Sequence, residues 1–311
     1  MKILDNSNKY LLPVLPAIIK TNLGKTAEKF DFIGGGSYGR VFRATLSDGS
    51  VIAVKAYRVQ GSQYNEKNQL EILSANTSVK MPQVLFTHED EETAILAMTF
   101  VEGQNVLNPA FLLKSKAQKQ KFSEDVISGM LGWHAVTNKK FGALDNPVYD
   151  SWHEFYKTEM QIPWLEGLSE LAENGKFSRE NLNLLKEATK IFDEVCPKDV
   201  TPVLIHSDLN IMNIMADPKT LELTAFIDPC GSCWADREYD LFQLRNMWGD
   251  AYGLYETYKN KTQLPEFADF RVAYYGAMNE AHCRLGGGLI MPVWEILCNN
   301  RLKKEMKKLK L

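Results

Sequence analysis

Residues 203–215 read VLIHSDLNIMNIM, in which an apolar run enters a polar turn and a second apolar run leaves it. The turn holds His206 and Asp208, and Asn213 follows the aspartate by five positions. An aspartate in such a loop can accept or orient the proton of an attacking hydroxyl, and the asparagine can bind magnesium. We therefore predict that Asp208 is a catalytic residue and Asn213 a metal ligand. His206 is expected to be buried and to support the loop rather than to carry a proton.

A second carboxylate follows fifteen residues after Asn213. Residues 225–229 read Ala-Phe-Ile-Asp-Pro, so Asp228 ends a short apolar strand. Two short strands joined by a turn at 217–220 would return the chain and place Asp228 beside Asn213. Because carboxylate and amide oxygens suit magnesium, we predict that Asp228 is its main ligand. Each of these polar residues could by itself only form a turn, so the prediction depends on the other motifs of the chain.

A glycine-rich stretch lies closer to the N-terminus. Residues 34–41 read GGGSYGRV and match the pattern G-x-G-x-x-G-x-V. Dinucleotide-binding folds share its first six positions, but they require a helix directly after the glycines. Here a β-hairpin follows, with Asp48-Gly49 in its turn. We therefore expect a flap whose backbone approaches nucleotide phosphates. The predicted contacts are Gly34, Gly36, Ser37, Gly39 and Val41.

Lys55 ends the strand that follows this hairpin turn. Ala53 and Lys55 share one face of the strand, because side chains alternate between the two faces. Ala53 would lie against the adenine, and Lys55 would reach the α and β phosphates. On the next helix Glu66 shares a stripe with Leu70, whereas Glu71 points away from it. We predict a Lys55–Glu66 pair; the simpler interpretations are a surface lysine and an exposed glutamate.

The chain changes character near residues 100–103. Segments rich in β-formers dominate before this point, and long helical patterns follow it at 111–137, 151–174, 178–196 and 252–261. We predict an α+β, two-lobed protein-kinase-like fold. Residues 1–102 would form a small nucleotide-binding lobe, and residues 103–311 a larger, mainly helical lobe for catalysis and substrate binding.

The composition is that of a globular protein with reduced cysteines. A net charge of −3 over 311 residues gives no attraction to nucleic acid or membrane, and no apolar run approaches the ~18 residues of a membrane span. Five irregularly spaced cysteines favour the cytoplasm. Cys230 and Cys233 could serve a metal or redox site, but no second pair follows them, and we expect two buried thiols. The basic end, 301–311, is expected to be a solvated helix face, and nothing indicates the oligomeric state.

These motifs resemble those of the aminoglycoside phosphotransferase and choline kinase superfamily over nearly the whole chain. The shared pattern is His206-Ser207-Asp208 through Asn213, then Ile227-Asp228-Pro229, then Tyr239-Asp240-Leu241. The chain looks most like the fructosamine (ketosamine) kinases, on residues 80–84, 141–156 and 236–240. The resemblance implies ATP and magnesium as cofactors. It also implies that Asp240 braces the catalytic loop, and that Thr99, Phe100 and Val101 present backbone groups to adenine.

The expected activity is ATP- and magnesium-dependent transfer of the γ-phosphoryl group to a hydroxyl of a small molecule. A protein acceptor is disfavoured, because only eleven residues separate Asp228 from Asp240 and leave no room for a long activation segment. A sugar–amine adduct such as a fructosamine is the first candidate acceptor, and an aminoglycoside or choline-type compound is the alternative. A nucleotide-binding pseudokinase scaffold is the alternative of another class, although Lys55, Asp208, Asn213 and Asp228 are all present.

Contacts to the acceptor are less marked in the sequence. A polycationic acceptor would need a carboxylate-rich cleft, although acidic residues also fit the wet faces of helices. Tryptophans could form an apolar or sugar-stacking wall, or belong to the core. Asn279-Glu280 and His282 are further candidates. The acidic residues are Asp145, Asp150, Glu154, Glu159, Glu166 and Glu170, and the tryptophans are Trp152, Trp164, Trp234 and Trp248.

Overall fold

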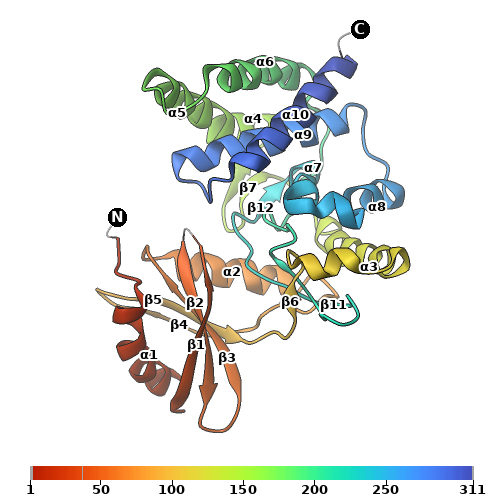
Figure 1. Cartoon of the computed structure of the whole chain (residues 1–311). Coiled ribbons are helices and arrows are strands. Elements are labelled where there is room, and N and C mark those ends of the chain that lie inside the picture. The colour runs from red at the N-terminus through yellow and green to blue at the C-terminus, as the bar shows by residue number, and fades with distance from the viewer. Residues whose placement is uncertain (1–2, 37, 310–311) are drawn as a thin grey trace.

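The computed structural model describes residues 3–36 and 38–309. Figure 1 shows a sheet-rich N-terminal part beside a larger helical part, which agrees with the predicted α+β class. Ser37, predicted to contact the nucleotide, lies outside the described residues. The division into domains at residues 1–102 and 103–311 stays a prediction.

A five-stranded antiparallel sheet forms the N-terminal part, in the order β1-β2-β3-β5-β4. The predicted hairpin is present, and its register pairs Val41 with Lys55 and Arg43 with Ala53. Because of this register, the strand that carries the lysine lies directly beside the strand that follows the flap. The elements are β1 (Ala27–Gly35), β2 (Gly39–Leu46), β3 (Val51–Tyr57), α2 (Ser62–Ser74), β4 (Val84–Glu89) and β5 (Ala94–Thr99).

Helix α1 (Asn8–Leu23) packs against this sheet, where no sequence pattern led us to expect a helix. Pro13 and Pro16 both lie inside the helix, and prolines in a helix interior each remove a backbone hydrogen bond. Leu15 and Ile19 are fully buried in a small core against β2, β3 and β5. This burial offsets the cost of the prolines, so tertiary packing overrides the local signal.

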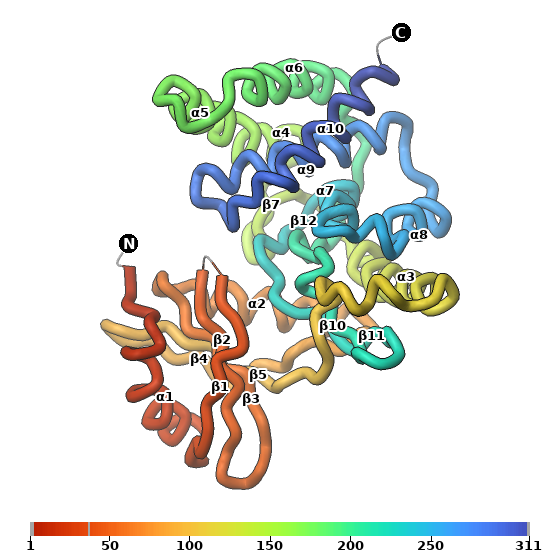
Figure 2. Tube along the Cα trace, viewed as in Figure 1, coloured from red at the N-terminus to blue at the C-terminus, as the bar shows by residue number. Residues whose placement is uncertain are grey.

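The helical part contains most of the patterns that the periodicity predicts, with shorter bounds. The predicted 151–174 helix is divided by a π-helical turn at Lys157–Gln161. Figure 2 traces the chain from β5 through β6 into α3. No helix among the described residues is long and apolar enough to cross a bilayer. The helices are α3 (Lys116–His134), α4 (Trp152–Tyr156), α5 (Ile162–Glu173), α6 (Arg179–Val195), α7 (Glu238–Leu241), α8 (Leu254–Lys261), α9 (Ala268–His282) and α10 (Pro292–Leu309).

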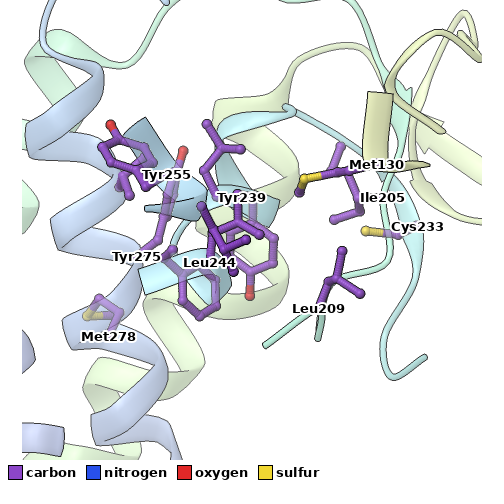
Figure 3. Close-up of a cluster of buried hydrophobic side chains, with 14 of the residues drawn as sticks. Met130, Ile205, Leu209, Cys233, Tyr239, Leu244, Tyr255, Tyr275 and Met278 are labelled. Carbon is purple, nitrogen blue, oxygen red and sulfur yellow. The ribbon is translucent and has the colours of Figure 1, made fainter. Parts of the chain in front are cut away.

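Two small sheets carry the segments of the helical part that hold the predicted catalytic residues. One has the order β11-β10-β6 and the other the order β8-β7-β12-β9. Ile205 and Leu209 flank the polar turn, are fully buried, and belong to the apolar cluster drawn in Figure 3. The turn is therefore anchored in the core on both sides. The strands are β6 (Gln104–Asn105), β7 (Phe141–Ala143), β8 (Pro147–Tyr149), β9 (Val203–Leu204), β10 (Ile214–Ala216), β11 (Leu223–Phe226) and β12 (Cys233–Ala235).

Candidate active site

Lys55 joins the two parts of the molecule. Its Nζ lies 2.6 Å from Glu66 Oε2 and also donates to Asp228, which is 173 residues away in the sequence. The Tyr57 hydroxyl donates to the same Glu66 oxygen at 2.6 Å. Burial lowers the pKa of Lys55, but the carboxylates of Asp228 and Glu66 outweigh it and raise that pKa above its ordinary value. Lys55 is therefore a buried cation held in place by a helix of one part and a loop of the other.

The catalytic loop brings Asp208 and Asn213 together. Asn213 Nδ2 donates to Asp208 Oδ2 at 2.9 Å, and to the Asp208 backbone carbonyl at 2.7 Å. Asn210 Nδ2 donates to the other oxygen, Oδ1, at 2.8 Å. The antiparallel pair β10–β11 then returns the chain, and Ile227 N donates to the Asn213 carbonyl at 3.0 Å. Asp228 follows directly, as the strand–turn–strand pattern predicts.

A buried aspartate supports this loop from below. Asp240 is fully buried, and it accepts hydrogen bonds from the backbone nitrogens of Ser207 at 2.7 Å and His206 at 3.1 Å. Ser207 has φ 69° and Asp228 has φ 57°, in the left-handed region. Residues other than glycine adopt this backbone conformation at a cost of about 1–3 kcal/mol, and such strained residues often cluster at functional sites. The bonds from Asp240 hold the strained turn in place.

Burial shifts the pKa values of His206 and Asp208, the two titratable groups in the loop, in opposite directions. It lowers the pKa of His206 to about 4, so the imidazole is neutral at neutral pH and is a packing group. Burial and the charge of Asp228 raise the pKa of Asp208 to about 8, against the hydrogen bonds from the two asparagines. A carboxylate whose pKa lies near neutrality is a better proton acceptor than an ordinary one.

The glycine flap and the end of β5 form the remaining predicted contacts. A Cβ on Gly39 would meet the Ala56 carbonyl oxygen at 2.6 Å, so only glycine fits there, whereas Gly34 and Gly36 face open space. Ala53 lies on β3, opposite Met98 of β5. Thr99 ends β5, and Phe100 and Val101 follow it, so the predicted adenine contacts lie one strand away from Ala53.

A comparison with known families decides the assignment. Residues 29–284 match the model of APH, the phosphotransferase enzyme family. This range includes the flap, Lys55, the catalytic loop and Asp228. The chain belongs to this family.

Individual relatives of this phosphotransferase are distant. The uncharacterized protein YcbJ of Escherichia coli K12 is 26% identical over 185 residues, which are 56% of this chain and 58% of YcbJ. The match thus spans less than two thirds of either protein. A "putative fructosamine-3-kinase" from Thermobifida fusca YX-ER1 has a TM-score of 0.68 and 19% identity, covering 94% of this chain and 98% of that one. The GDP and kanamycin complex of APH(2″)-IIia has a TM-score of 0.66 and 15% identity, covering 96% and 99%. These structures confirm the two-lobed kinase-like fold.

The oxygen donors of this phosphotransferase fit a magnesium ion. Asp228 Oδ1 receives Lys55, whereas its side chain stays 49% exposed; Asn213 turns its Nδ2 to Asp208. One carboxylate oxygen and one amide oxygen thus remain for a cation. Within the described ranges no three His, Cys, Asp or Glu side chains cluster as a metal site. Magnesium in phosphoryl-transfer sites takes one or two protein ligands and completes its shell with phosphates and water, so the two donors suffice.

Several contacts in the site carry no sequence signal. The Tyr38 hydroxyl on the flap donates to the Gly287 carbonyl between α9 and α10, at 3.0 Å. Gln69 on α2 accepts from the backbone nitrogen of Ser232, in the loop after Asp228. Gln243 Nε2 donates to the Ser207 carbonyl at 3.1 Å. Each contact joins segments far apart in the sequence, so no local pattern could have identified it.

The residues considered as acceptor contacts differ in their exposure to solvent. All six acidic candidates are exposed on helix or loop surfaces. Trp152 and Trp234 are buried in the core, whereas Trp164 stacks on His282 with 4.0 Å between the ring centres. Glu280 is buried. Cys230 is exposed, so our expectation of two buried thiols is wrong for it, because the loop after Asp228 turns this side chain outward while Cys233 enters β12.

Proposed function

We propose that this protein is an ATP- and magnesium-dependent kinase that transfers the γ-phosphoryl group to a hydroxyl of a small molecule. The observation that carries the proposal is the ion pair between Lys55 and Asp228. This contact between the two parts of the molecule supports a site in which the flap and Lys55 lie opposite the loop with Asp208 and the predicted magnesium ligand Asp228. The family match supports the reaction class, and family members with bound nucleotide, such as the GDP complex above, support nucleotide use.

The nucleotide would lie between the sheet and the catalytic loop. Gly34 and Gly36, which face open space, would let the flap backbone come close to the phosphates, and Lys55, kept charged by Asp228 and Glu66, would bind the α and β phosphates. Ala53 and residues 99–101 would receive the adenine. Since Glu66 is itself held by Tyr57, the lysine is oriented before nucleotide arrives, which lowers the cost of organising the site.

Asp208 would act on the acceptor hydroxyl. The amides of Asn210 and Asn213 fix its carboxylate, so that it can accept a hydrogen bond from the hydroxyl and take its proton as the oxygen attacks the γ-phosphorus. Magnesium held by Asp228 and Asn213 would neutralise the negative charge that gathers on the transferring group. Asp240 keeps the loop in its strained shape and is a positioning residue.

The acceptor and the cellular location are finer proposals. We take a sugar–amine adduct of the fructosamine type as the first candidate, because one of the similar folds carries that name, and an aminoglycoside as the second. All five cysteines are free, which fits a reducing compartment such as the cytoplasm.

The test is phosphate transfer from γ-labelled ATP to a fractionated metabolite extract, with and without magnesium. We expect label in a small-molecule fraction that depends on both magnesium and Asp208. Nucleotide binding without ATP consumption across all fractions would instead identify a scaffold, and the kinase proposal would be wrong.

A further inference from the structure

The tip of the glycine flap is attached to the helical part through a tyrosine. Tyr38 lies between the end of β1 and the start of β2, and its hydroxyl donates to the Gly287 carbonyl at 3.0 Å. Figure 1 shows the loop between α9 and α10, which contains this glycine, facing the flap end of the sheet. The position of the Gly287 carbonyl therefore influences where the tip of the flap rests.

His282, the last residue of α9, fixes the position of Gly287. A Cβ on this glycine would lie 2.0 Å from Cε1, 2.3 Å from Nδ1 and 2.5 Å from Nε2 of the imidazole. The glycine main chain thus packs directly on the ring. The Gly287 nitrogen also donates to the His282 carbonyl at 3.4 Å. A side chain at position 287 would push the loop away from the ring.

A tryptophan of α5 holds the imidazole in turn. Trp164 stacks on His282 with 4.0 Å between the ring centres and 9° between the ring planes. Burial lowers the pKa of His282 below its ordinary value, so at neutral pH the imidazole is uncharged and stacks as a neutral aromatic ring. Three residues along α5, a Cβ on Gly167 would lie 3.0 Å from the Leu285 side chain. Helix α5 therefore contacts both ends of the segment 282–285 that leads to the loop.

These contacts form one continuous path from α5 to the flap. Ring stacks on ring, ring packs on the glycine main chain, and the glycine carbonyl accepts from the tyrosine. The path ends near the predicted catalytic loop. Burial raises the pKa of Tyr38, and the charges of Cys230, Cys283 and Asp208 add to that rise. The tip of the flap therefore lies close to the predicted proton acceptor.

We propose that Trp164 and His282 are positioning residues for the glycine flap. They act through Gly287 and Tyr38 and hold the flap over the nucleotide phosphates. The inference rests on the proposed function, which puts the phosphates under the flap. Loss of either ring lets the loop move and takes the Gly287 carbonyl away from the tyrosine, so the nucleotide is released faster. The increase is limited to about threefold, because only one exposed neutral hydrogen bond is lost.

Dissociation of a fluorescent ADP derivative from the full chain, followed by stopped flow with magnesium present, tests this inference. Tyr38→Phe and Trp164→Ala should each raise the dissociation rate constant about threefold. The double substitution should also raise it about threefold, because both changes break the same path, whereas independent effects would multiply to about ninefold. Gly287→Ala drives a methyl group into the His282 ring. It should give the same rise and the same coupling to Tyr38→Phe, which preserves the test if Trp164→Ala does not fold.

Two further variants separate positioning from a general loss of structure. Trp164→Phe keeps an aromatic ring on the imidazole and should restore the natural rate constant. Trp248→Ala is the matched control and should leave the rate constant unchanged, because Trp248 is half exposed and packs edge-on against Trp294, outside the path. Circular dichroism checks that each variant is folded.

Three results would overturn the inference. They are an unchanged rate constant in folded Trp164→Ala, a ninefold rise in the double variant, and a rise in Trp164→Phe as large as that in Trp164→Ala. Binding of the ADP derivative to the natural protein is measured first. Absence of binding there would refute the kinase proposal, whereas binding with independent effects of the two substitutions would refute this inference alone.

Discussion

The predicted nucleotide side, around Lys55 and the turn at 206–208, and the predicted acceptor side, on α9 and α10, are held in different ways. On the nucleotide side Lys55, Glu66 and Asp228 neutralise one another, and Asp240 ties down the catalytic turn through two backbone nitrogens. On the predicted acceptor side Glu280 has no hydrogen-bond or ion-pair partner among residues 3–36 and 38–309, and three consecutive glycines at 286–288 lead into an exposed apolar segment. Contacts within the protein thus organise the groups around Lys55 and the turn, whereas Glu280 is left uncompensated among the described residues.

The largest expected effect comes from removing the proton acceptor on the organised side. Asp208→Asn keeps the hydrogen-bonding shape but cannot take a proton, and turnover should fall by roughly two orders of magnitude or more. Nucleotide affinity should stay within about twofold, because Lys55 and Asp228 are untouched. ADP release and calorimetry measure the two quantities, with exposed Asp145→Asn as the control. Near-normal turnover would remove Asp208 from the mechanism.

The unpaired carboxyl of the acceptor side should give a pH-dependent stability. Burial and Glu295 raise the pKa of Glu280 to about 7 from an ordinary value of 4.5, while Arg284 pairs with Glu295 and the thiols of Cys283 and Cys298 lie alongside. Between pH 4.5 and 7 the folded chain therefore holds a proton that the unfolded chain releases. The contribution of Glu280 to the free energy of unfolding is fully present below pH 4.5 and is lost as the pH rises through 7.

Glu280→Gln stays neutral at every pH and removes that loss. The free energy of unfolding of the natural protein minus that of the variant should fall by on the order of 2 kcal/mol between pH 5 and 8. Urea unfolding at several pH values measures it, and Glu173→Gln should show no such trend. A difference that stays constant with pH would mean that Glu280 is already compensated in the empty protein.

A smaller effect is expected from Asp228, one of the three charged residues that neutralise one another around Lys55. Asp228→Ala removes the predicted magnesium ligand and one of the two carboxylates on Lys55, so magnesium-dependent nucleotide affinity should weaken about tenfold, close to the worth of one hydrogen bond to a charged group. Calorimetry with and without magnesium measures the change, and Asp145→Ala is the matched control. Unchanged affinity would assign magnesium to other donors.

The smallest effect should arise where the two sides meet. Tyr38→Phe removes the hydroxyl that reaches Gly287 across the cleft, and the apparent affinity for both substrates should weaken about threefold, because exposed neutral hydrogen bonds contribute little. Steady-state KM values measure this, with exposed Tyr64→Phe on α2 as the control. A loss confined to one substrate would show that the contact serves one side only.

The chemistry could be predicted from the sequence because its residues follow local rules. The strand period places Ala53 and Lys55 on one face, the helix period chooses Glu66 over Glu71, and a strand–turn–strand brings Asp228 back to Asn213. The family match and the fold confirm the kind of protein that these patterns indicate. The roles of the individual residues stay predictions.

By itself, then, the sequence determined the fold class, the reaction class and the candidate groups on the nucleotide side, since short-range geometry fixes their spacing. Only the tertiary structure decided that a helix with two internal prolines covers the sheet, that Tyr38 reaches Gly287, and that Glu280 is buried with no partner in the part of the chain that the structure describes. These features depend on which surfaces meet after folding. Burial and compensation of charge are properties of that long-range packing, and a local pattern does not encode them.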